Sequence, residues 1–257
     1  MKGFNAAFVN EAVKLLKKKK MISAAILSIL AVLAGQIAVT LIKNDLGIRV
    51  VGGNEFPLLV LSIITYTILP LFVTLVVIDM FNGEFSSNTM KLTLLNPVSR
   101  LGVFSAKVLN LALFIFANLM FVMIFSMFAG FLFNSASVSL VGVIKIILSY
   151  LSTCLPVFVF GLLIVLLSNV FERGSAVFFM SIIIFIGFNI FGFLFSSYSS
   201  FFITSMFDWY TLWLSDSINV FKIIRQILIM LGCGLMLFTA GFYLFDRRDI
   251  HNKGSER

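Results

Sequence analysis

The sequence predicts an all-α integral membrane protein with six transmembrane helices, and composition is the first reason. Of its 257 residues, 60% are hydrophobic and only 12% are charged, and the mean hydropathy is +1.10. A soluble domain carries about 25% charged residues. These values exclude a soluble globule, a disordered chain and a nucleic-acid-binding domain. The two cysteines form no Cys-x-x-Cys or Cys/His cluster, so no disulfide framework or metal site is predicted.

Six apolar runs supply the second reason, because a helix needs roughly 20 apolar residues to cross a bilayer. The runs are residues 21–42, 56–77, 108–133, 143–167, 176–195 and 223–245. Pro70 lies in the second run and Pro156 in the fourth, and each is expected to kink its helix. The first run is longer than the core of a signal peptide, so we expect it to remain as a helix.

The placement of basic residues predicts that both termini lie on the cytoplasmic side. With that orientation, 14 of the 19 lysines and arginines lie on the inner side and 5 on the outer side, as the positive-inside rule requires. Residues 246–257 then form a cytoplasmic tail. The inner charge also suits contact with anionic membrane lipid.

Residues 1–20 differ from the six runs in their pattern. Phe4, Phe8, Glu11 with Ala12, and Leu15 recur at helical spacing, and four lysines follow. This pattern is typical of an amphipathic helix that lies in the membrane interface. A frayed tail is the alternative.

The apolar runs hold no acidic residue near mid-membrane, where ion-coupled transporters need one. Their central polar residues are neutral, and interhelical hydrogen bonds are the simplest explanation for them. They are Gln36, Thr40, Thr65, Thr74, Asn118, Thr153 and Asn189. Of these, Gln36, Thr65 and Asn189 are candidates for a translocation pathway. The chain has no phosphate-binding loop and no catalytic motif, so energy for uphill transport must enter from a partner.

The segment between the second and third runs is the most informative part of the sequence. Residues 81–96 favour a short helix with an apolar edge at Leu92, Leu94 and Leu95, and Pro97 ends it. By the charge rule this segment is cytoplasmic. A short helix lying flat under the membrane is suited to dock in a groove of a partner protein.

This segment resembles the signature of permease subunits of type-2 ABC exporters. The matching residues are Glu84, Thr89, Met90, Leu94, Leu95, Pro97, Ser99, Arg100 and Lys107. The resemblance implies six helices with an amphipathic N-terminal helix, and it makes 81–96 the coupling helix that inserts into a separate ATP-binding subunit. The contacts it implies with that subunit are Glu84, Thr89, Met90, Leu94, Pro97 and Arg100.

The resemblance also implies a second cytoplasmic contact at Glu172 and Arg173, between the fourth and fifth runs. It implies a dimer with a second permease subunit, identical or related, in a bacterial plasma membrane. ATP and magnesium would lie in the partner ATPase, with no cofactor in this chain. Because the chain lacks a large extracellular domain, it is most similar to small permeases for peptides, toxins, antibiotics or drugs.

Two alternatives stay open. The aromatic stretch 197–217 either forms short re-entrant gate helices, as family members often have, or is an aromatic belt at the outer interface. The whole chain is either the permease described above or a stand-alone membrane channel, sensor or scaffold without an ATPase.

Overall fold

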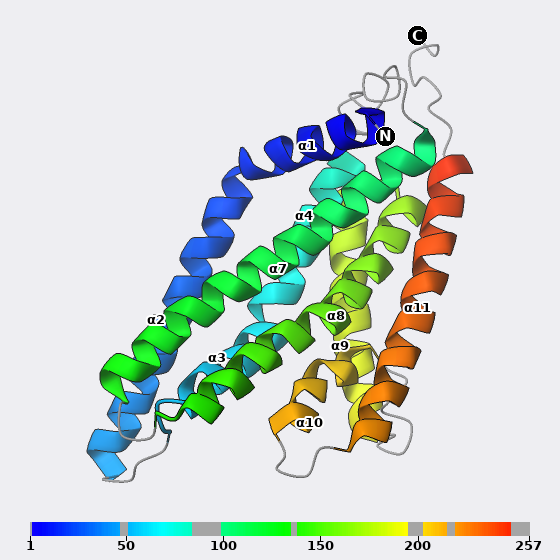
Figure 1. The fold of residues 1–257 in the computed structure, drawn as a ribbon. Helices are drawn as coiled ribbons and strands as arrows, with labels where there is room; N and C mark the ends of the chain where they lie inside the picture. The colour runs from blue at the N-terminus through cyan, green and yellow to red at the C-terminus, as the bar shows by residue number, and fades with distance from the viewer. Residues whose placement is uncertain are drawn as a thin grey trace.

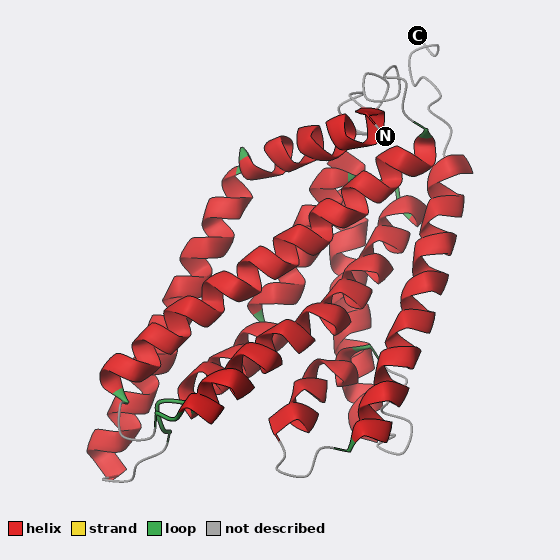
Figure 2. Cartoon of the chain, in the orientation of Figure 1, coloured by secondary structure: helices red, strands yellow, loops and turns green. Residues whose placement is uncertain are grey.

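The fold is a bundle of long helices, with α1 lying across one end (Figure 1). The computed structural model describes residues 2–46, 51–83, 99–134, 138–194, 203–214 and 219–247, and these ranges contain helices and no strand (Figure 2). The predicted all-α class is therefore confirmed for them. The α-helices are α1 Lys2–Leu16, α2 Lys19–Leu46, α3 Glu55–Tyr66, α4 Ile68–Met80, α7 Arg100–Phe133, α8 Leu140–Val170, α9 Gly174–Leu194, α10 Thr211–Leu214 and α11 Val220–Arg247, and the 3-10 helix η3 is Thr204–Tyr210.

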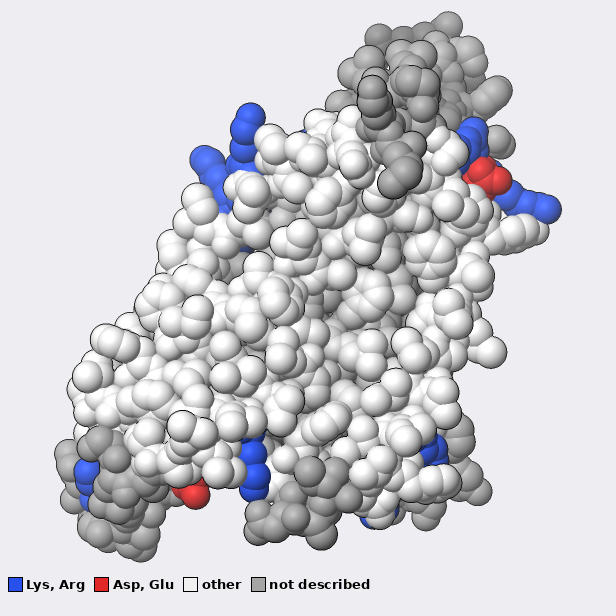
Figure 3. All heavy atoms as spheres, viewed as in Figure 1, with Lys and Arg blue, Asp and Glu red and all other residues white. Residues whose placement is uncertain are grey.

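Five of the described helices are long and apolar enough to cross a membrane, and the bent pair α3–α4 brings the number to six if it is one span. The five are α2, α7, α8, α9 and α11. The most apolar windows of α9 and α11 are only 11% buried, so these two helices leave most of their apolar surface uncovered. Figure 3 shows one face of the molecule, where a broad uncharged band lies between charged ends.

Several helices extend beyond the apolar runs that predict them. We predicted a third span from residue 108, but α7 begins at Arg100 because Ser99 caps it, accepting a hydrogen bond from the Gly102 backbone N–H at 3.1 Å. Ser139 caps α8 in the same way. At the other end of the chain, α11 continues through Asp246 to Arg247, into the predicted tail. Hydropathy detects only the apolar part of a helix, whereas capping sets its ends.

The second predicted span, residues 56–77, is two helices that meet at Thr67 with a 45° bend. Pro70 explains the break, because it has no N–H to donate to the Tyr66 carbonyl four residues earlier. The two helices together run the length of α7. Gly53, just before α3, lies against Gly130 near one end of α7, and Met80 at the end of α4 accepts a hydrogen bond from Lys107 near the other.

The N-terminal helix is shorter than residues 1–20. It ends at Leu16, a turn at Lys17 and Lys18 follows, and α2 begins at Lys19. The buried side of α1 includes Glu11 and Leu15 and packs on α7. The predicted amphipathic face is therefore present, and the lysine run forms an elbow between α1 and α2 instead of the last turn of α1.

The other end of the bundle holds part of the aromatic stretch as η3 and α10. Phe207, Trp209 and Tyr210 are buried against the bundle, and Trp209 Nε1 donates to the Ser152 carbonyl of α8 at 2.9 Å. The described part of the stretch therefore forms short helices packed on the bundle, and the gate role stays a prediction. Residues 197–202 and 215–217 of the stretch lie outside the described residues.

Candidate functional site

The candidate site is the end of the bundle crossed by α1, which we call the α1 end. The last turn of α4, the first turn of α7, the α8–α9 turn and the last turn of α11 all lie there (Figure 1). Residues 84–98, which contain most of the predicted coupling helix, connect α4 to α7 at this end and lie outside the described residues. The contacts of the residues on either side of that segment are described, and they define the site.

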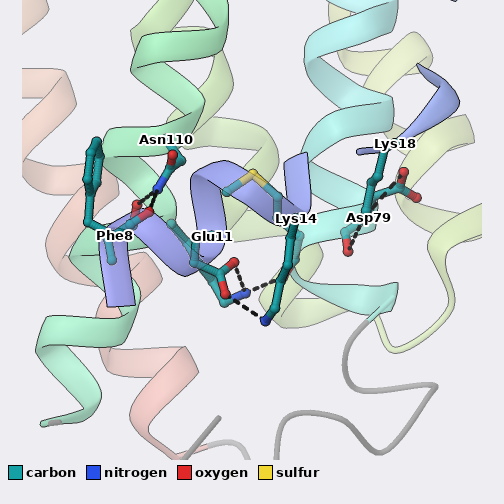
Figure 4. A network of polar contacts seen from close by, with 9 residues as sticks. Phe8, Glu11, Lys14, Lys18, Asp79 and Asn110 are labelled. Atoms are coloured by element: carbon teal, nitrogen blue, oxygen red, sulfur yellow. Dashed lines mark hydrogen bonds and ion pairs between the residues drawn. The ribbon is translucent and has the colours of Figure 1, made fainter. Parts of the chain in front are cut away.

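The central support is a buried ion pair between Lys107 of α7 and Glu11 of α1. Lys107 is 0% exposed, and its ammonium donates to Glu11 Oε2 at 2.9 Å and to the Met80 carbonyl at 2.8 Å. Lys14 donates to the other Glu11 oxygen at 2.8 Å (Figure 4). A buried ion pair persists only where such additional hydrogen bonds satisfy its charges. One ammonium group thus fastens α1, α4 and α7 together.

Three further hydrogen bonds hold α1 and the elbow in place (Figure 4). The Asn110 amide of α7 donates to the Phe8 carbonyl of α1 at 3.1 Å. Lys20 donates to Asp79 Oδ1 of α4 at 2.8 Å, and Lys18 donates to the Asp79 carbonyl at 3.2 Å. The elbow is therefore tied to the last turn of α4, directly before the predicted coupling segment.

Asn82 ties the start of that segment to the α8–α9 turn. Its side-chain amide donates to the carbonyls of Phe171 and Glu172 at 2.7 and 3.0 Å, and its oxygen accepts a hydrogen bond from Ser168. Glu172 and Arg173 are exposed in this turn. The predicted second contact therefore lies next to the start of the predicted coupling helix, of which residues 81–83 are described.

Arg100 marks the far end of the same segment. Its guanidinium donates to the Asp246 carbonyl and lies 3.7 Å from the Asp246 carboxylate, so it joins the start of α7 to the end of α11. The other predicted ATPase contacts lie outside the described residues; they are Glu84, Thr89, Met90, Leu94 and Pro97.

The three pathway candidates lie on three different helices, and no described hydrogen bond joins them. Gln36 of α2 is buried and accepts from the Asn134 amide, just past α7, at 3.1 Å. Thr65 of α3 is fully buried and donates to the Leu61 carbonyl of its own helix. Asn189 of α9 is half-buried and donates to a carbonyl of α9.

The predicted interhelical hydrogen bonding of mid-span polar residues is therefore right for Gln36 and wrong for several others. Four of these residues donate to the carbonyl four residues earlier in the same helix, and they are Thr65, Thr74, Thr153 and Asn189. A short polar side chain in a helix reaches that carbonyl without any partner helix. Sequence position alone does not distinguish this local bond from a bond between helices.

At the opposite end, Asp208 of η3 accepts a hydrogen bond from the Tyr66 hydroxyl at 2.7 Å, beside the α3–α4 break. Burial, with a further contribution from the Asp208 carboxylate, raises the pKa of the Tyr210 hydroxyl above its ordinary value. The hydroxyl thus stays protonated. Within the described ranges, no group of three or more His, Cys, Asp and Glu side chains is placed to hold a metal ion.

Sequence reasoning missed two buried supports of the site. Glu11 and Lys107 are separated by 96 positions, and Asn82 bonds to residues 86 to 90 positions away. One signal was available for the first: Glu11 is the charged member of the otherwise apolar set on α1. Because an unpaired buried charge is costly, a carboxylate on the buried face of a helix indicates a buried cation as its partner. Asn82 offered no comparable signal.

Comparison with known proteins adds a family assignment to this geometry. A sequence model of the family described as "ABC-2 family transporter protein" matches residues 7–192, from within α1 to the last turn of α9. The matched range includes Glu11, Asp79, Lys107 and the whole segment 84–98. A search of curated proteins finds no match. With most of its length matched, the chain belongs to the ABC-2 family of transporter proteins and is a multi-pass membrane component of the permease type.

Proposed function

We propose that the chain is the permease subunit of an ATP-driven exporter and that it forms the translocation pathway as a dimer with a second permease subunit. Separate ATP-binding subunits would hold ATP and magnesium and supply the energy. The observation that carries this proposal is the α1 end. There the family match covers residues 84–98, and the two flanks of this segment are fastened to α1, α8, the α8–α9 turn and α11 by buried or multiple polar contacts.

The proposed topology has six spans, with both termini on the cytoplasmic side of a bacterial plasma membrane. The α3–α4 pair counts as one span, since its two ends lie near opposite ends of α7. The lysine-rich elbow, Arg100, Arg173 and Arg247 then all lie on the inner side, in agreement with the positive-inside rule.

In the proposed mechanism, residues 81–96 form the coupling helix. Glu84, Thr89, Met90 and Leu94 contact the ATPase, Pro97 and Arg100 fix the exit of the helix, and Glu172 and Arg173 make the second contact. Closure of the ATP-binding subunits moves this helix. The movement is transmitted to α7 and α1 through the bond between Met80 and Lys107. It is transmitted to the start of α9 through the bond between Asn82 and the α8–α9 turn.

The substrate we propose is an amphipathic peptide, toxin, antibiotic or drug. The uncovered apolar faces of α9 and α11 suit contact with lipid and with a second permease subunit. Gln36, Thr65 and Asn189 are the proposed pathway residues, since they are neutral polar groups within apolar helices.

The decisive experiment is a co-purification from the native membrane. We would tag the chain, extract it in a mild detergent and identify by mass spectrometry any bound protein that carries a phosphate-binding loop. A variant with residues 84–96 scrambled tests the contact, and a variant with residues 248–257 scrambled is the matched control. We expect an ATPase to bind the native chain and the control, and to be lost from the first variant.

A second test separates coupling from binding. In the purified complex, Glu84→Ala and Met90→Asp are expected to lower substrate-stimulated ATP hydrolysis while the permease stays folded. Unchanged stimulation in both variants would contradict the proposed contact. A well-folded chain that binds no ATPase under several mild conditions would favour the alternative, a stand-alone channel, sensor or scaffold.

A further inference from the structure

A cavity of about 590 Å³ lies beneath the elbow between α1 and α2, bounded on its far side by the last turns of α4. Its walls have two distinct chemical characters. One part carries the four lysines of the elbow region, Lys14, Lys17, Lys18 and Lys20. The other part is apolar and consists of Leu15, Met21, Val76 and Met80.

The polar part of this cavity has an excess of positive charge. Its lysines face two carboxylates, Glu11 and Asp79, and Glu11 is also bonded to the buried Lys107. The side chains of Lys14, Lys18 and Lys20 are 37 to 40% exposed, so their ammonium groups reach the mouth of the cavity. Figure 3 shows Lys and Arg side chains gathered at this elbow. Among the described residues that line the cavity, four lysines outnumber two carboxylates, and an anionic group of modest size would offset part of this excess charge.

The position of the cavity relative to the apolar part of α2 favours an anion that also carries an apolar group. The lysine turn ends where α2 begins its apolar run, and the first outward side chains of that run, Ile22 and Ile26, are 62% and 52% exposed. This change from lysine to exposed isoleucine within two turns is the profile of a membrane interface. A ligand at this level has its charged part among the lysines and its apolar part along α2 and α4.

We propose that this cavity binds one anionic phospholipid, with the headgroup phosphate held by the elbow lysines and an acyl chain lying on the apolar wall. Basic cavities between membrane helices are suited to such headgroups. The lipid would lie against Asp79, Met80 and Glu11, the residues that fasten α1 to α4 and α7. Its binding therefore stabilises the elbow, whether or not an ATPase is present.

The test measures lipid-dependent thermal stability of the purified full-length chain in detergent, without any partner protein. Phosphatidylglycerol, phosphatidylcholine and inorganic phosphate are each added over a concentration series. We expect phosphatidylglycerol alone to raise the melting temperature in a saturable manner. Protection by inorganic phosphate to the same extent would assign the cavity to free phosphate instead, and equal protection by phosphatidylcholine would remove the role of the lysines. Either result overturns the proposal.

Three variants locate the effect. Lys14→Gln/Lys17→Gln removes two cavity lysines, and we expect about a fivefold weaker phosphatidylglycerol midpoint for each lysine lost. Met21→Trp fills the cavity without changing charge, and we expect it to abolish protection. Lys43→Gln/Lys222→Gln removes the same charge at the far end of the bundle and is expected to keep the native midpoint. An equal loss in this control pair would mean general surface attraction and would overturn the proposal.

The melting temperature of each variant in phosphatidylcholine shows whether it folds. A folded Met21→Trp protein that phosphatidylglycerol still protects fully would also overturn the proposal, because it would place the lipid elsewhere. None of these outcomes depends on whether the chain has an ATPase partner, so failure of this inference and failure of the proposed function are distinguishable.

Discussion

At the scale of single residues, the position of Lys107 decides how the α1 end is held. An ammonium group taken out of water is costly, and the cost is offset only by close partners of opposite charge and by further hydrogen bonds. Lys107 has both in Glu11 and the Met80 carbonyl, with the Phe81 ring centroid 5.8 Å from its Nζ atom. The three groups come from α1, α4 and the turn after α4. Lys107 therefore stabilises the packing of α1 and α4 against α7.

We expect an asymmetric double-mutant cycle at this pair. Glu11→Leu leaves the Lys107 ammonium buried with only a carbonyl partner, and the free energy of unfolding is expected to fall by about 3 kcal/mol or more. Lys107→Met is expected to cost less, because Glu11 keeps its contact with Lys14. The double variant is expected to be close to Lys107→Met alone. Denaturation by sodium dodecyl sulfate in mixed micelles measures these values.

Lys14→Met is the control for this cycle. Lys14 bonds the same carboxylate but is 37% exposed, so solvent screening reduces the expected cost to below about 1 kcal/mol. Additive effects of Glu11→Leu and Lys107→Met in the double variant would show that the pair is not an energetic unit.

At the scale of elements, the backbone just before α3 meets the backbone of α7 near its C-terminal end. A Cβ added at Gly130 would lie 2.7 Å from the Gly53 carbonyl oxygen. Backbone atoms cannot rotate out of the way as a side chain does, so α7 and the start of α3 would have to separate. Glycine at these positions is required for a close approach between helices, as is common in membrane bundles.

Gly130→Ala is therefore expected to lower the free energy of unfolding by about 1–3 kcal/mol, the usual cost of overpacking. Gly232→Ala in α11 is the matched control, because a Cβ there meets nothing within 4 Å. We expect the control to be neutral or slightly more stable. Thermal melting of the two variants in the same detergent makes the comparison, and equal melting temperatures would contradict the close approach.

A second prediction at this scale concerns the bond between α4 and the α8–α9 turn. Asn82→Ala removes three hydrogen bonds, and we expect coupled ATP hydrolysis by the complex to fall several-fold. Asn54→Ala is the control, since the Asn54 amide also joins two distant elements, by donating to Ser139 at the far end of the bundle. If both variants lose stability but only the first loses coupling, the α1 end transmits the movement. An equal loss of coupling in both variants would show that the loss in Asn82→Ala comes from general destabilisation.

The elements themselves show what could be predicted from the sequence. Spans were found because twenty apolar residues in a row have few alternatives to a membrane helix. The α3–α4 break lay within one apolar run, so hydropathy could not reveal it, although Pro70 marked its position to within one turn. Cap residues such as Ser99 moved helix ends by up to two turns. The contacts of Glu11 and Asn82 depend on the packing of distant elements, which no local pattern encodes.

At the scale of the whole molecule, the two ends of the bundle differ in charge. The described part of the α1 end carries the lysine elbow together with Arg100, Arg173 and Arg247, whereas the described basic residues of the far end are Lys43, Lys145, Lys222 and Arg225. Transmembrane orientation follows this asymmetry because translocating positive charge is disfavoured. The proposed inward placement of the α1 end rests on it.

Labelling of single cysteines tests that orientation. In a Cys154→Ala/Cys233→Ala background, we expect Lys43→Cys and Lys222→Cys to react with a membrane-impermeant maleimide in intact cells. Lys17→Cys and Glu172→Cys are expected to react only after permeabilisation. Labelling of Lys17→Cys and Lys43→Cys from the same side would contradict a first span between them, and a complete reversal would invert the topology.

The ion pair of Lys107 and Glu11 has a consequence for the order in which the protein is made. Ribosomes synthesise Glu11 ahead of Lys107 by 96 residues, so the carboxylate is already at the membrane surface when the lysine leaves the ribosome. When the helix that contains Lys107 enters the bilayer, Glu11 is then already present to pair with the lysine. A protein lacking its first sixteen residues would have to insert this lysine unaccompanied, and we expect such a truncation to reduce the yield of inserted protein before it affects any step of transport.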